Sequence, residues 1–317
     1  MKILVTGGAG FIGSHLVDKL IKKNQKVIVV DNLSQGKIQN IENHFELKNF
    51  EFIKEDFSSN KIDKFLTDVD IVYHVAAYPE VRTGFDNPRL AFNENILKTF
   101  ELLEKIRKFQ IKKLVFTSSS VVYGDADIIP TPEEYSPLQP VSMYGSTKLT
   151  CENLISSYSN MYNIKATILR FANVIGKRSN HGIIWDFIHK VKNNKNKLEI
   201  LGDGKQIKSY IHVDDCINGI ILAEEKSNNL INIFNIGNED WINSLDIGKI
   251  VCDSLNLNHN IIEFVGGTSD GRGWIGDIKK MRLDIKKIRD YGWTPNYNSV
   301  EAVKKTSKEL INEIYEK

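Results

Sequence analysis

The first half of the chain alternates short apolar runs with longer amphipathic stretches. The apolar runs predict strands at residues 2–6, 26–30, 51–54, 71–75, 113–117 and 165–169. The stretches between them predict helices at residues 11–22, 88–108 and 141–161. Runs such as VIVV are continuously apolar, which is typical of strands covered on both faces. We therefore predict the α/β class, with a doubly wound parallel sheet of βαβ crossovers.

The second half of the chain has a looser pattern. Helices are predicted at residues 183–193, 214–226, 244–255 and 299–315, with frequent glycine and proline between 202 and 295. This predicts two domains: a sheet domain over residues 1–175 and a smaller C-terminal α/β lobe over residues 176–317. Within the lobe, the segments near 209–213 and 231–236 are expected to return to the main sheet.

Composition excludes several classes of partner. The 317 residues carry 42 basic and 40 acidic side chains, a formal net charge of +2, so no nucleic-acid partner and no membrane surface is predicted. The basic run at residues 192–197 is interpreted as a solvated loop. No apolar run approaches the length of a membrane span. Three widely spaced cysteines without a CxxC pair predict reduced thiols in a cytoplasmic protein, and no metal site.

Glycines follow the first predicted strand in a spacing that suits a dinucleotide. The strand KILVT is followed by GGAGFIG, in which Gly7, Gly10 and Gly13 are spaced by threes. Glycine permits a tight turn, allows the backbone to approach a pyrophosphate, and lets the helix pack on the strand. The helix N-terminus then offers free N–H groups to phosphates. Phe11 and Ile12, between the glycines, belong to the same predicted cofactor-binding loop.

Acidic and small residues follow the next strands. Asp31 ends the second strand, where a carboxylate can accept hydrogen bonds from ribose hydroxyls and would repel a 2′-phosphate. NAD is therefore predicted rather than NADP. The remaining predicted cofactor contacts after these strands are Asn32, Asp56, Ala76 and Ala77. Asp56 would meet the adenine amino group, with a turn or helix-cap role as the alternative.

A tyrosine and a lysine four residues apart open the helix that follows the fifth strand. Tyr144 and Lys148 form a YxxxK pattern, which places both on one helix face. A nearby ammonium favours the phenolate, so Tyr144 can serve as a base near neutral pH, and Lys148 can also hold a nicotinamide ribose. The fifth strand ends in TSSSVVYG, and ligands of doubly wound sheets bind at strand carboxyl ends. The serine run is thus placed to bind a substrate oxygen, with a turn or cap as the alternative.

These motifs together resemble a known family over nearly the whole chain. The segments GGAGFIGSHL, DNLS, HVAA, SSSVVYG, YGSTK, LRFANVIG, GDGKQIKSYIHVDD and RGWIGDI occur in the order seen in the extended short-chain dehydrogenase/reductases. Within them the chain is similar to the NAD-dependent epimerase/dehydratase group, and most to UDP-glucose 4-epimerases. The resemblance implies a Rossmann domain with NAD as cofactor and a nucleotide sugar as substrate.

The resemblance also implies roles for residues at matching positions. Asn95 matches an asparagine near the cofactor, and Ser119 matches the catalytic serine or threonine, assisted by Ser120. Tyr144 would be the base and Lys148 its partner. Four further residues match contacts to the sugar diphosphate or its ribose: Asn173, Lys208, Arg272 and Asp277. Lys208 stands where many relatives carry arginine, and lysine supplies charge without a bidentate fork.

The implied activity is inversion of C4 of a UDP-hexose, UDP-glucose or UDP-galactose, through a transient 4-keto intermediate. Val121 stands where dehydratases and decarboxylases of the group carry an acid, and valine cannot move a proton. Met281 stands near a position that limits the sugar's C2 substituent, so N-acetylated sugars are also expected to enter. The alternatives are a decarboxylase, a dehydratase, a reductase, or a non-catalytic NAD-sensing module. The resemblance further implies a homodimer that pairs the helices at 88–108 and 141–161.

Overall fold

The computed structural model describes residues 1–79 and 87–315, which form two compact units. Unit 1 comprises Met1–Val122, Met143–Arg170 and Ile220–Phe234, and unit 2 comprises Tyr123–Ser142, Phe171–Gly219 and Asn235–Lys317. Across the described part of the chain, none of the helices is both long enough and apolar enough to cross a membrane.

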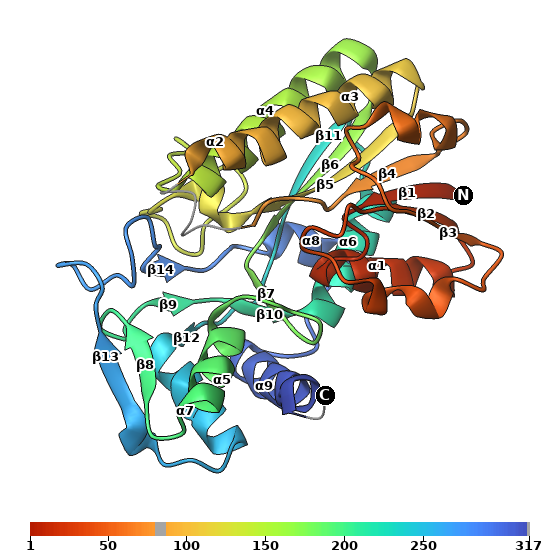
Figure 1. Cartoon of the computed structure of the whole chain (residues 1–317). Helices are drawn as coiled ribbons and strands as arrows, with labels where there is room; N and C mark the ends of the chain where they lie inside the picture. Colours follow the sequence, from red (N-terminus) through yellow and green to blue (C-terminus); the bar gives the residue numbers. More distant parts are fainter. Residues whose placement is uncertain (80–86, 316–317) are drawn as a thin grey trace. The chain divides into compact units, whose positions relative to one another are not determined.

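Unit 1 is built on a seven-stranded sheet in the order β11-β6-β5-β4-β1-β2-β3 (Figure 1). The four pairings among β1 to β5 are parallel. The strands are β1 (Lys2–Thr6), β2 (Lys26–Val30), β3 (Phe50–Ile53), β4 (Ile71–His74), β5 (Lys113–Ser119), β6 (Lys165–Phe171) and β11 (Ile231–Ile236). The side chains of β1, β2, β4, β5 and β6 are mostly buried on both faces, as the continuous apolar runs predicted.

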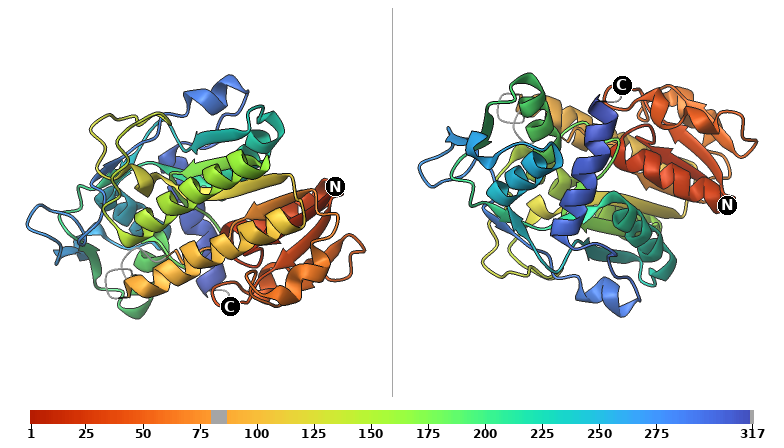
Figure 2. Two further views of the ribbon diagram at one scale, coloured as in Figure 1. Left: turned by 90° about the horizontal axis from the view of Figure 1, so that it is seen from above. Right: turned by 90° about the horizontal axis from the view of Figure 1, so that it is seen from below.

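Helices cover both faces of this sheet. The helix α1 (Phe11–Lys22) lies on one face, and α2 (Pro88–Ala91), α3 (Lys98–Lys108) and α4 (Met143–Tyr162) lie on the other (Figure 1). Seen from above, α3 and α4 run side by side (Figure 2). The apolar core between these helices and the sheet is fully enclosed, with Leu102, Phe116 and Ile155 each about 1% exposed. The predicted doubly wound α/β class is confirmed.

The prediction of a single α-helix over residues 88–108 is wrong in one respect. Its middle, Phe92–Leu97, is π-helical and separates α2 from α3. The side chain of Asn95 in this segment bonds the backbone of Tyr78 and the hydroxyl of Thr147. Hydrophobic periodicity does not register such distant bonds, so it predicted an uninterrupted α-helix.

Unit 2 consists of short strands and three packed helices. The helices α5 (Ile183–Asn193), α7 (Ser244–Ser254) and α9 (Ser299–Tyr315) contact one another around an apolar core (Figure 2). Two more helices are α6 (Val213–Lys226), which continues into unit 1, and α8 (Lys286–Asp290). The strands are β7 (Asn173–Ile175), β8 (Leu198–Leu201), β9 (Ile207–Lys208), β10 (Tyr210–His212), β12 (Ile242–Asn243), β13 (Ile262–Val265) and β14 (Lys280–Met281).

The two segments expected to return to the main sheet differ in outcome. Residues 231–236 form β11 and complete the seven-stranded sheet beside β6. Residues 210–212 form β10, which pairs with β7 in a separate two-stranded sheet. The edge of β6 is already taken by β11, so β10 finds its partner in the short strand that follows β6. The expectation for residues 209–213 is corrected accordingly.

Candidate active site

The glycine loop between β1 and α1 has no room for side chains. Gly7 has a positive φ of 70°, and a Cβ there would lie 2.7 Å from the backbone of Ala76. A Cβ on Gly13 would lie 2.1 Å from the carbonyl oxygen of Gly7. The helix α1 begins after Gly10 without a side-chain cap, so the first N–H groups, from Phe11 onward, are open to an anion. This loop fits the pyrophosphate of a dinucleotide.

Asp31 is held rigidly at the end of β2. Its Oδ2 accepts a hydrogen bond of 2.9 Å from the N–H of Ala9, and its Oδ1 accepts one of 2.8 Å from Leu33. Burial raises the pKa of this carboxyl, and the two backbone bonds counteract that rise. Each carboxylate oxygen has a second lone pair, so both remain able to accept bonds from ribose hydroxyls. The backbone of the glycine loop thus fixes the acid in place.

Asp56, beyond β3, accepts several hydrogen bonds within the protein itself. Its Oδ1 accepts hydrogen bonds from the N–H and hydroxyl of Ser58, and its Oδ2 accepts bonds from Asn32 and from Lys98 at 2.7 Å. Burial works against the charge, but the bonds from Lys98 and Ser58 lower the pKa of Asp56. Any contact with an adenine amino group must share these acceptors.

The segment after β4 is anchored from two sides. The Cα of Ala76 lies against Gly7, and Ala77 follows it. The carboxamide of Asn95 accepts a bond of 2.7 Å from the N–H of Tyr78 and donates to the Tyr78 carbonyl and to Thr147. Asn95 is 3% exposed, and these bonds use both ends of its amide group. Asn95 therefore holds residues 76–78, the segment in which Ala76 and Ala77 are predicted to contact the cofactor.

Tyr144 and Lys148 lie one turn apart on α4, and Lys148 contacts β5. Its Nζ donates a hydrogen bond of 2.8 Å to the carbonyl of Thr117 and lies 5.8 Å from the centre of the Tyr144 ring. Burial lowers the pKa of Lys148 to about 8 and raises the pKa of Tyr144. Phenolate formation at Tyr144 thus depends on cations brought close to it.

The serine run ends β5 two residues beyond this lysine contact. Ser119 is the last residue of the strand, is half-buried, and accepts a long bond of 3.4 Å from the N–H of Val121. Ser120 is buried in the turn that follows. Between Ser119 and Val122 the chain carries only hydroxyl and aliphatic side chains. This strand end can orient an oxygen atom but has no group that titrates near neutral pH.

A buried acid, which was not among the predicted site residues, lies behind the YxxxK pair. Glu152 lies one turn after Lys148 on α4 and forms an ion pair with Arg170 on β6, the side chains being 4% and 3% exposed. The hydroxyl of Ser118 donates to Glu152 Oε1 at 2.5 Å. The signal was present, because Tyr144, Lys148 and Glu152 are spaced by fours on one helix face.

In unit 2, Lys208 is paired with Asp277. The two side chains meet at 2.6 Å, and Asp277 also accepts a bond from the N–H of Gly273. Asp277 is 3% exposed, whereas 17% of the Lys208 side chain is exposed, beside the Trp274 ring at 5.5 Å. Met281, on β14, stands directly opposite Lys208 on β9. The structure therefore brings Lys208, Asp277 and Met281 into one neighbourhood.

Arg272 belongs to the same neighbourhood but is held by other acids. It pairs with Asp125 at 2.9 Å and with Asp270 at 2.8 Å, and its Nη1 donates to the carbonyl of Asp277 at 2.5 Å. The bonds to Asp125 and Asp270 raise the pKa of Arg272. Asn173, half-buried on β7, donates to the carbonyl of Ser209, the residue after Lys208. Unit 2 therefore collects cations whose charges are already balanced.

Comparisons with known proteins identify the family. The family model for the NAD dependent epimerase/dehydratase family matches residues 3–237. A putative UDP-glucose 4-epimerase of Methanocaldococcus jannaschii is 36% identical, covering 98% of each chain. The crystal structure of a UDP-galactose 4-epimerase is 40% identical with a TM-score of 0.87, covering 99% of this chain and 100% of that one. UDP-glucuronic acid decarboxylase 2 of Arabidopsis thaliana is 31% identical over 99% of this chain and 69% of its own length.

The glycine loop, the fixed Asp31 and the YxxxK face all occur in unit 1, within the matched region. Relatives named as epimerases and as decarboxylases match at comparable identity, so the comparisons identify the family and not one activity within it. The chain belongs to the NAD-dependent epimerase/dehydratase family of nucleotide-sugar enzymes, a group of the extended short-chain dehydrogenase/reductases, and NAD is its cofactor.

Proposed function

We propose that this chain is an epimerase that inverts C4 of a UDP-hexose, interconverting UDP-glucose and UDP-galactose through a transient 4-keto intermediate. The observation that carries the proposal is the bond from Lys148 to Thr117. It brings the helix face that holds Tyr144 to the strand that ends in Ser119. Relatives named as UDP-glucose or UDP-galactose 4-epimerases match this chain over nearly its whole length, which supports the proposal.

The residues of unit 1 suit a reversible oxidation at a sugar hydroxyl. The glycine loop and Asp31 would hold NAD, which would supply reversible hydride transfer at C4 on either face of the sugar. Tyr144 takes the proton of the 4-hydroxyl and later gives it back. The ammonium of Lys148 lowers the cost of the phenolate, and the Ser119 hydroxyl bonds the sugar oxygen, with Ser120 assisting. No net change of cofactor results.

The alternatives within the family need an acid that this strand end lacks. A dehydratase must protonate a leaving oxygen, and here Ser120 and Val121 occupy the positions that follow Ser119. Neither side chain titrates near neutral pH. Epimerisation needs only the proton that Tyr144 already moves, so this composition favours epimerase over dehydratase or decarboxylase.

The cations of unit 2 suit the nucleotide diphosphate. We assign Lys208 and Arg272 to its phosphate oxygens, Asp277 to a ribose hydroxyl, and Asn173 to the sugar diphosphate. Met281 is 8% exposed and lies opposite Lys208, and we assign it to the side of the sugar's C2 substituent. Methionine is unbranched and adapts its shape, so UDP-N-acetylglucosamine is also expected to react. A turnover comparison of the two sugars tests this, and no reaction of the N-acetylated one contradicts it.

The decisive experiment incubates purified protein with UDP-glucose and no added cofactor. Formation of UDP-galactose, followed by NMR, supports the proposal, and its absence overturns it. Tyr144→Phe is expected to abolish turnover while the protein retains NAD. In a non-catalytic NAD-sensing module, the same substitution would barely change NAD binding or the response to a partner. Release of carbon dioxide from UDP-glucuronate, or stoichiometric consumption of NADH, would identify a decarboxylase or a reductase instead.

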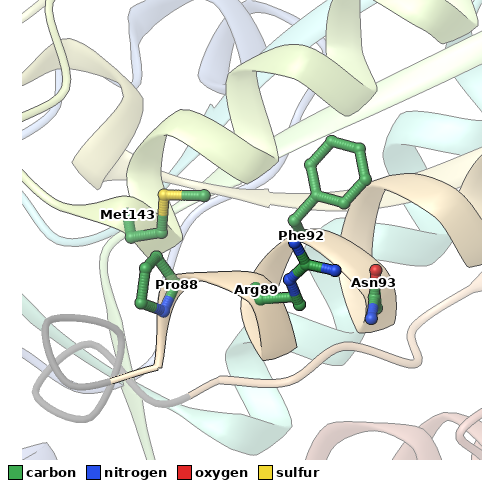
Figure 3. Close-up of a pocket in the computed structure, with 5 residues that line it drawn as sticks. All are labelled: Pro88, Arg89, Phe92, Asn93 and Met143. Carbon is green, nitrogen blue, oxygen red and sulfur yellow. The ribbon is translucent and has the colours of Figure 1, made fainter.

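We also propose that two copies associate through the outer face of α3 and α4. Phe100 and Met161 are 38% and 68% exposed there, and the Phe100, Tyr158 and Tyr162 rings form a continuous row. An open pocket of about 390 Å³ continues this surface at the start of α4, lined by Pro88, Arg89, Phe92, Asn93 and Met143 (Figure 3). Such an apolar surface fits a second copy of the same chain.

Sedimentation measures this association. The wild type is expected at the mass of a dimer and Met161→Glu at the mass of a monomer, with Leu47→Glu, at another exposed apolar residue of unit 1, as the control. A monomeric wild type contradicts the proposal. All three cysteines are free and buried, which suits a reducing compartment, and we place the protein in the cytoplasm. Recovery of the native protein outside the cell membrane on fractionation would contradict that placement.

A further inference from the structure

The ion pair between Glu152 and Arg170 is enclosed in unit 1 behind the proposed catalytic face. Arg170 Nη2 donates to Glu152 Oε2 at 2.7 Å, and Arg170 Nε donates to Oε1 at 3.1 Å. Ser118 donates to the same Oε1. The carboxylate is thus held by a two-pronged contact from β6 and by one hydroxyl from β5.

Two consecutive residues of β5 bind two consecutive turns of α4. The Thr117 carbonyl accepts from Lys148 at 2.8 Å, and the Ser118 hydroxyl donates to Glu152 at 2.5 Å. The next residue of the strand is Ser119. Two bonds at neighbouring points fix both the rotation of a helix and its position along its axis relative to a strand. One bond alone would leave the rotation adjustable.

Stability alone does not account for a buried pair of this kind. Removing two charges from water is costly, and well-packed apolar residues of similar volume commonly stabilise as well or better. Apolar side chains also pack around α4, with Ile155, Leu114 and Phe116 nearly fully enclosed. A charged, directional contact in such a place specifies one arrangement of the helix among several that apolar packing would permit.

We propose that Glu152, together with Ser118 and Arg170, is the positioning group that keeps Lys148 and Tyr144 in register with Ser119. Glu152 acts through Lys148 and does not touch the sugar. The inference rests on the proposed function insofar as Tyr144, Lys148 and Ser119 perform the chemistry.

The charge of Glu152 affects the pKa of Lys148. This effect can be measured separately from any effect of Glu152 on stability. Burial lowers the pKa of Lys148 to about 8, and the nearby charge of Glu152 counteracts that shift. The groups that face Lys148 are Tyr144, Cys151 and Glu152 on α4, His74 on β4, and Arg170 on β6 through Glu152. Burial lowers the pKa of His74 to about 3, so it adds no charge near neutral pH. Loss of the Glu152 charge therefore lowers the pKa of Lys148 further.

Two substitutions separate position from charge. Glu152→Asp keeps the charge but withdraws the carboxylate by one methylene, which breaks the bond from Ser118. We expect kcat for UDP-glucose epimerisation to fall by about ten- to a hundredfold, since small misplacements of reacting groups cost this much, with KM within about twofold. Glu152→Gln keeps the shape and loses the charge. We expect the alkaline limb of its pH–kcat profile to move to lower pH, because Lys148 loses its proton earlier.

A third substitution keeps the ion pair and tests the hydroxyl alone. Ser118→Ala leaves Glu152 bonded to Arg170, so the variant folds even where loss of the acid is not tolerated. We expect kcat to fall by about three- to tenfold, the value of one buried hydrogen bond, and Ser118→Thr to restore it. The matched control is Asp63→Asn, which weakens the ion pair with the buried Lys105 on α3 of the same unit. It is expected to lower the melting temperature and leave the pH profile unchanged.

Unchanged kcat and pH profile in Ser118→Ala and Glu152→Asp, with only the melting temperature lowered, would overturn the inference. Crystal structures of the wild type and Glu152→Asp decide the matter even if the protein turns over no UDP-hexose and the proposed function fails. A Lys148–Thr117 bond that is lengthened or lost in the variant supports the inference. The same bond at its wild-type length overturns it.

Discussion

The two units hold their cations in opposite ways. In unit 1 the ammonium of Lys148 is buried and its hydrogen bond goes to a neutral carbonyl, while the charge of Glu152 acts on it from the next turn of α4. In unit 2 the guanidinium of Arg272 and the ammonium of Lys208 are partly exposed and already paired with carboxylates. The first arrangement favours deprotonation of the neighbouring Tyr144 phenol, and the second favours reversible capture of an anion. The comparison predicts that substitutions in unit 1 change kcat, and that those in unit 2 change KM.

The largest effect is expected at Lys148. Lys148→Met removes the charge that favours the Tyr144 phenolate, and kcat should fall by about a thousandfold, as is typical for loss of acid–base function. Steady-state kinetics with UDP-glucose measure the change. Lys105→Met is the control, because Lys105 is also a buried lysine of unit 1, 5% exposed, but it bonds Asn60 and Asp63 instead of the strand end. Equal losses in both variants would mean that Lys148 matters for stability alone.

The next effect concerns the cofactor loop of unit 1. The Cβ of Gly13→Ala would collide with the Gly7 carbonyl at 2.1 Å, and relief of that contact should cost about 1 to 3 kcal/mol of stability or NAD affinity. The purified variant is expected to contain little NAD, measured after acid release. The control is Gly248→Ala on α7, whose Cβ would meet side-chain carbons and no backbone, with Ile200 Cδ1 nearest at 3.0 Å. Full NAD content in Gly13→Ala would show that the loop tolerates a side chain.

In unit 2 the expected change is in binding. Arg272→Gln should raise KM for UDP-glucose by about tenfold with kcat nearly constant, since one charge-assisted contact to the substrate is lost in both ground and transition states. Asp125→Asn should lower KM by about threefold, because Arg272 no longer has to leave that carboxylate.

Arg289→Gln controls for general loss of positive charge, since Arg289 pairs with Glu239 and is about half exposed. If Arg272→Gln lowered kcat and left KM unchanged, the contrast between the units would fail.

The smallest effect is a pH-dependent contribution of His212 to stability. Burial disfavours its charge, but bonds to Asp214 and Glu309 prevail and raise its pKa above the unfolded value. The stabilisation is therefore complete below about pH 6.5, the unfolded value, and is lost as the pH rises through the folded one. His212→Gln should cost about 1 to 2 kcal/mol at pH 5.5 and less at pH 9.

Tryptophan fluorescence in urea measures this change in unit 2, because all 4 tryptophans lie there. The control is His259→Gln, since the pair of His259 with Asp253 is exposed and should contribute little. A pH-independent cost at His212 would rule out linkage to its protonation.

The sequence predicted what depends on local pattern. Strand, glycine turn and helix at residues 2–22 agree with the structure almost to the residue, because each part is determined by neighbours in the chain. The π-helical turn at Asn95 was missed because its cause lies in bonds to Tyr78 and Thr147. The short strands β8, β9, β12, β13 and β14 were missed because each has few residues and pairs with a segment far along the chain.

In the candidate site too, local features were predicted from the sequence and contacts between distant segments were not. Motif spacing located the YxxxK face and the glycine loop, since both lie within one element or one turn. It did not predict that Asp56 is engaged by Lys98, that Asp125 and Asp270 hold Arg272, or that Glu152 is buried against Arg170. Charged residues are solvated on most helix faces, and only the packing of distant strands makes these ones partners.

The position of β11 bears on how the chain folds as it is synthesised. β11 lies at the edge of the sheet beside β6. In the sequence, 59 residues separate the last residue of β6, Phe171, from the first residue of β11, Ile231. Until Ile236 has left the ribosome, β6 exposes a row of unpaired backbone groups flanked by apolar side chains. Such an exposed strand edge is prone to aggregation. A fragment that stops near residue 175 would keep that edge permanently, so a chaperone or the rest of the polypeptide must shield it.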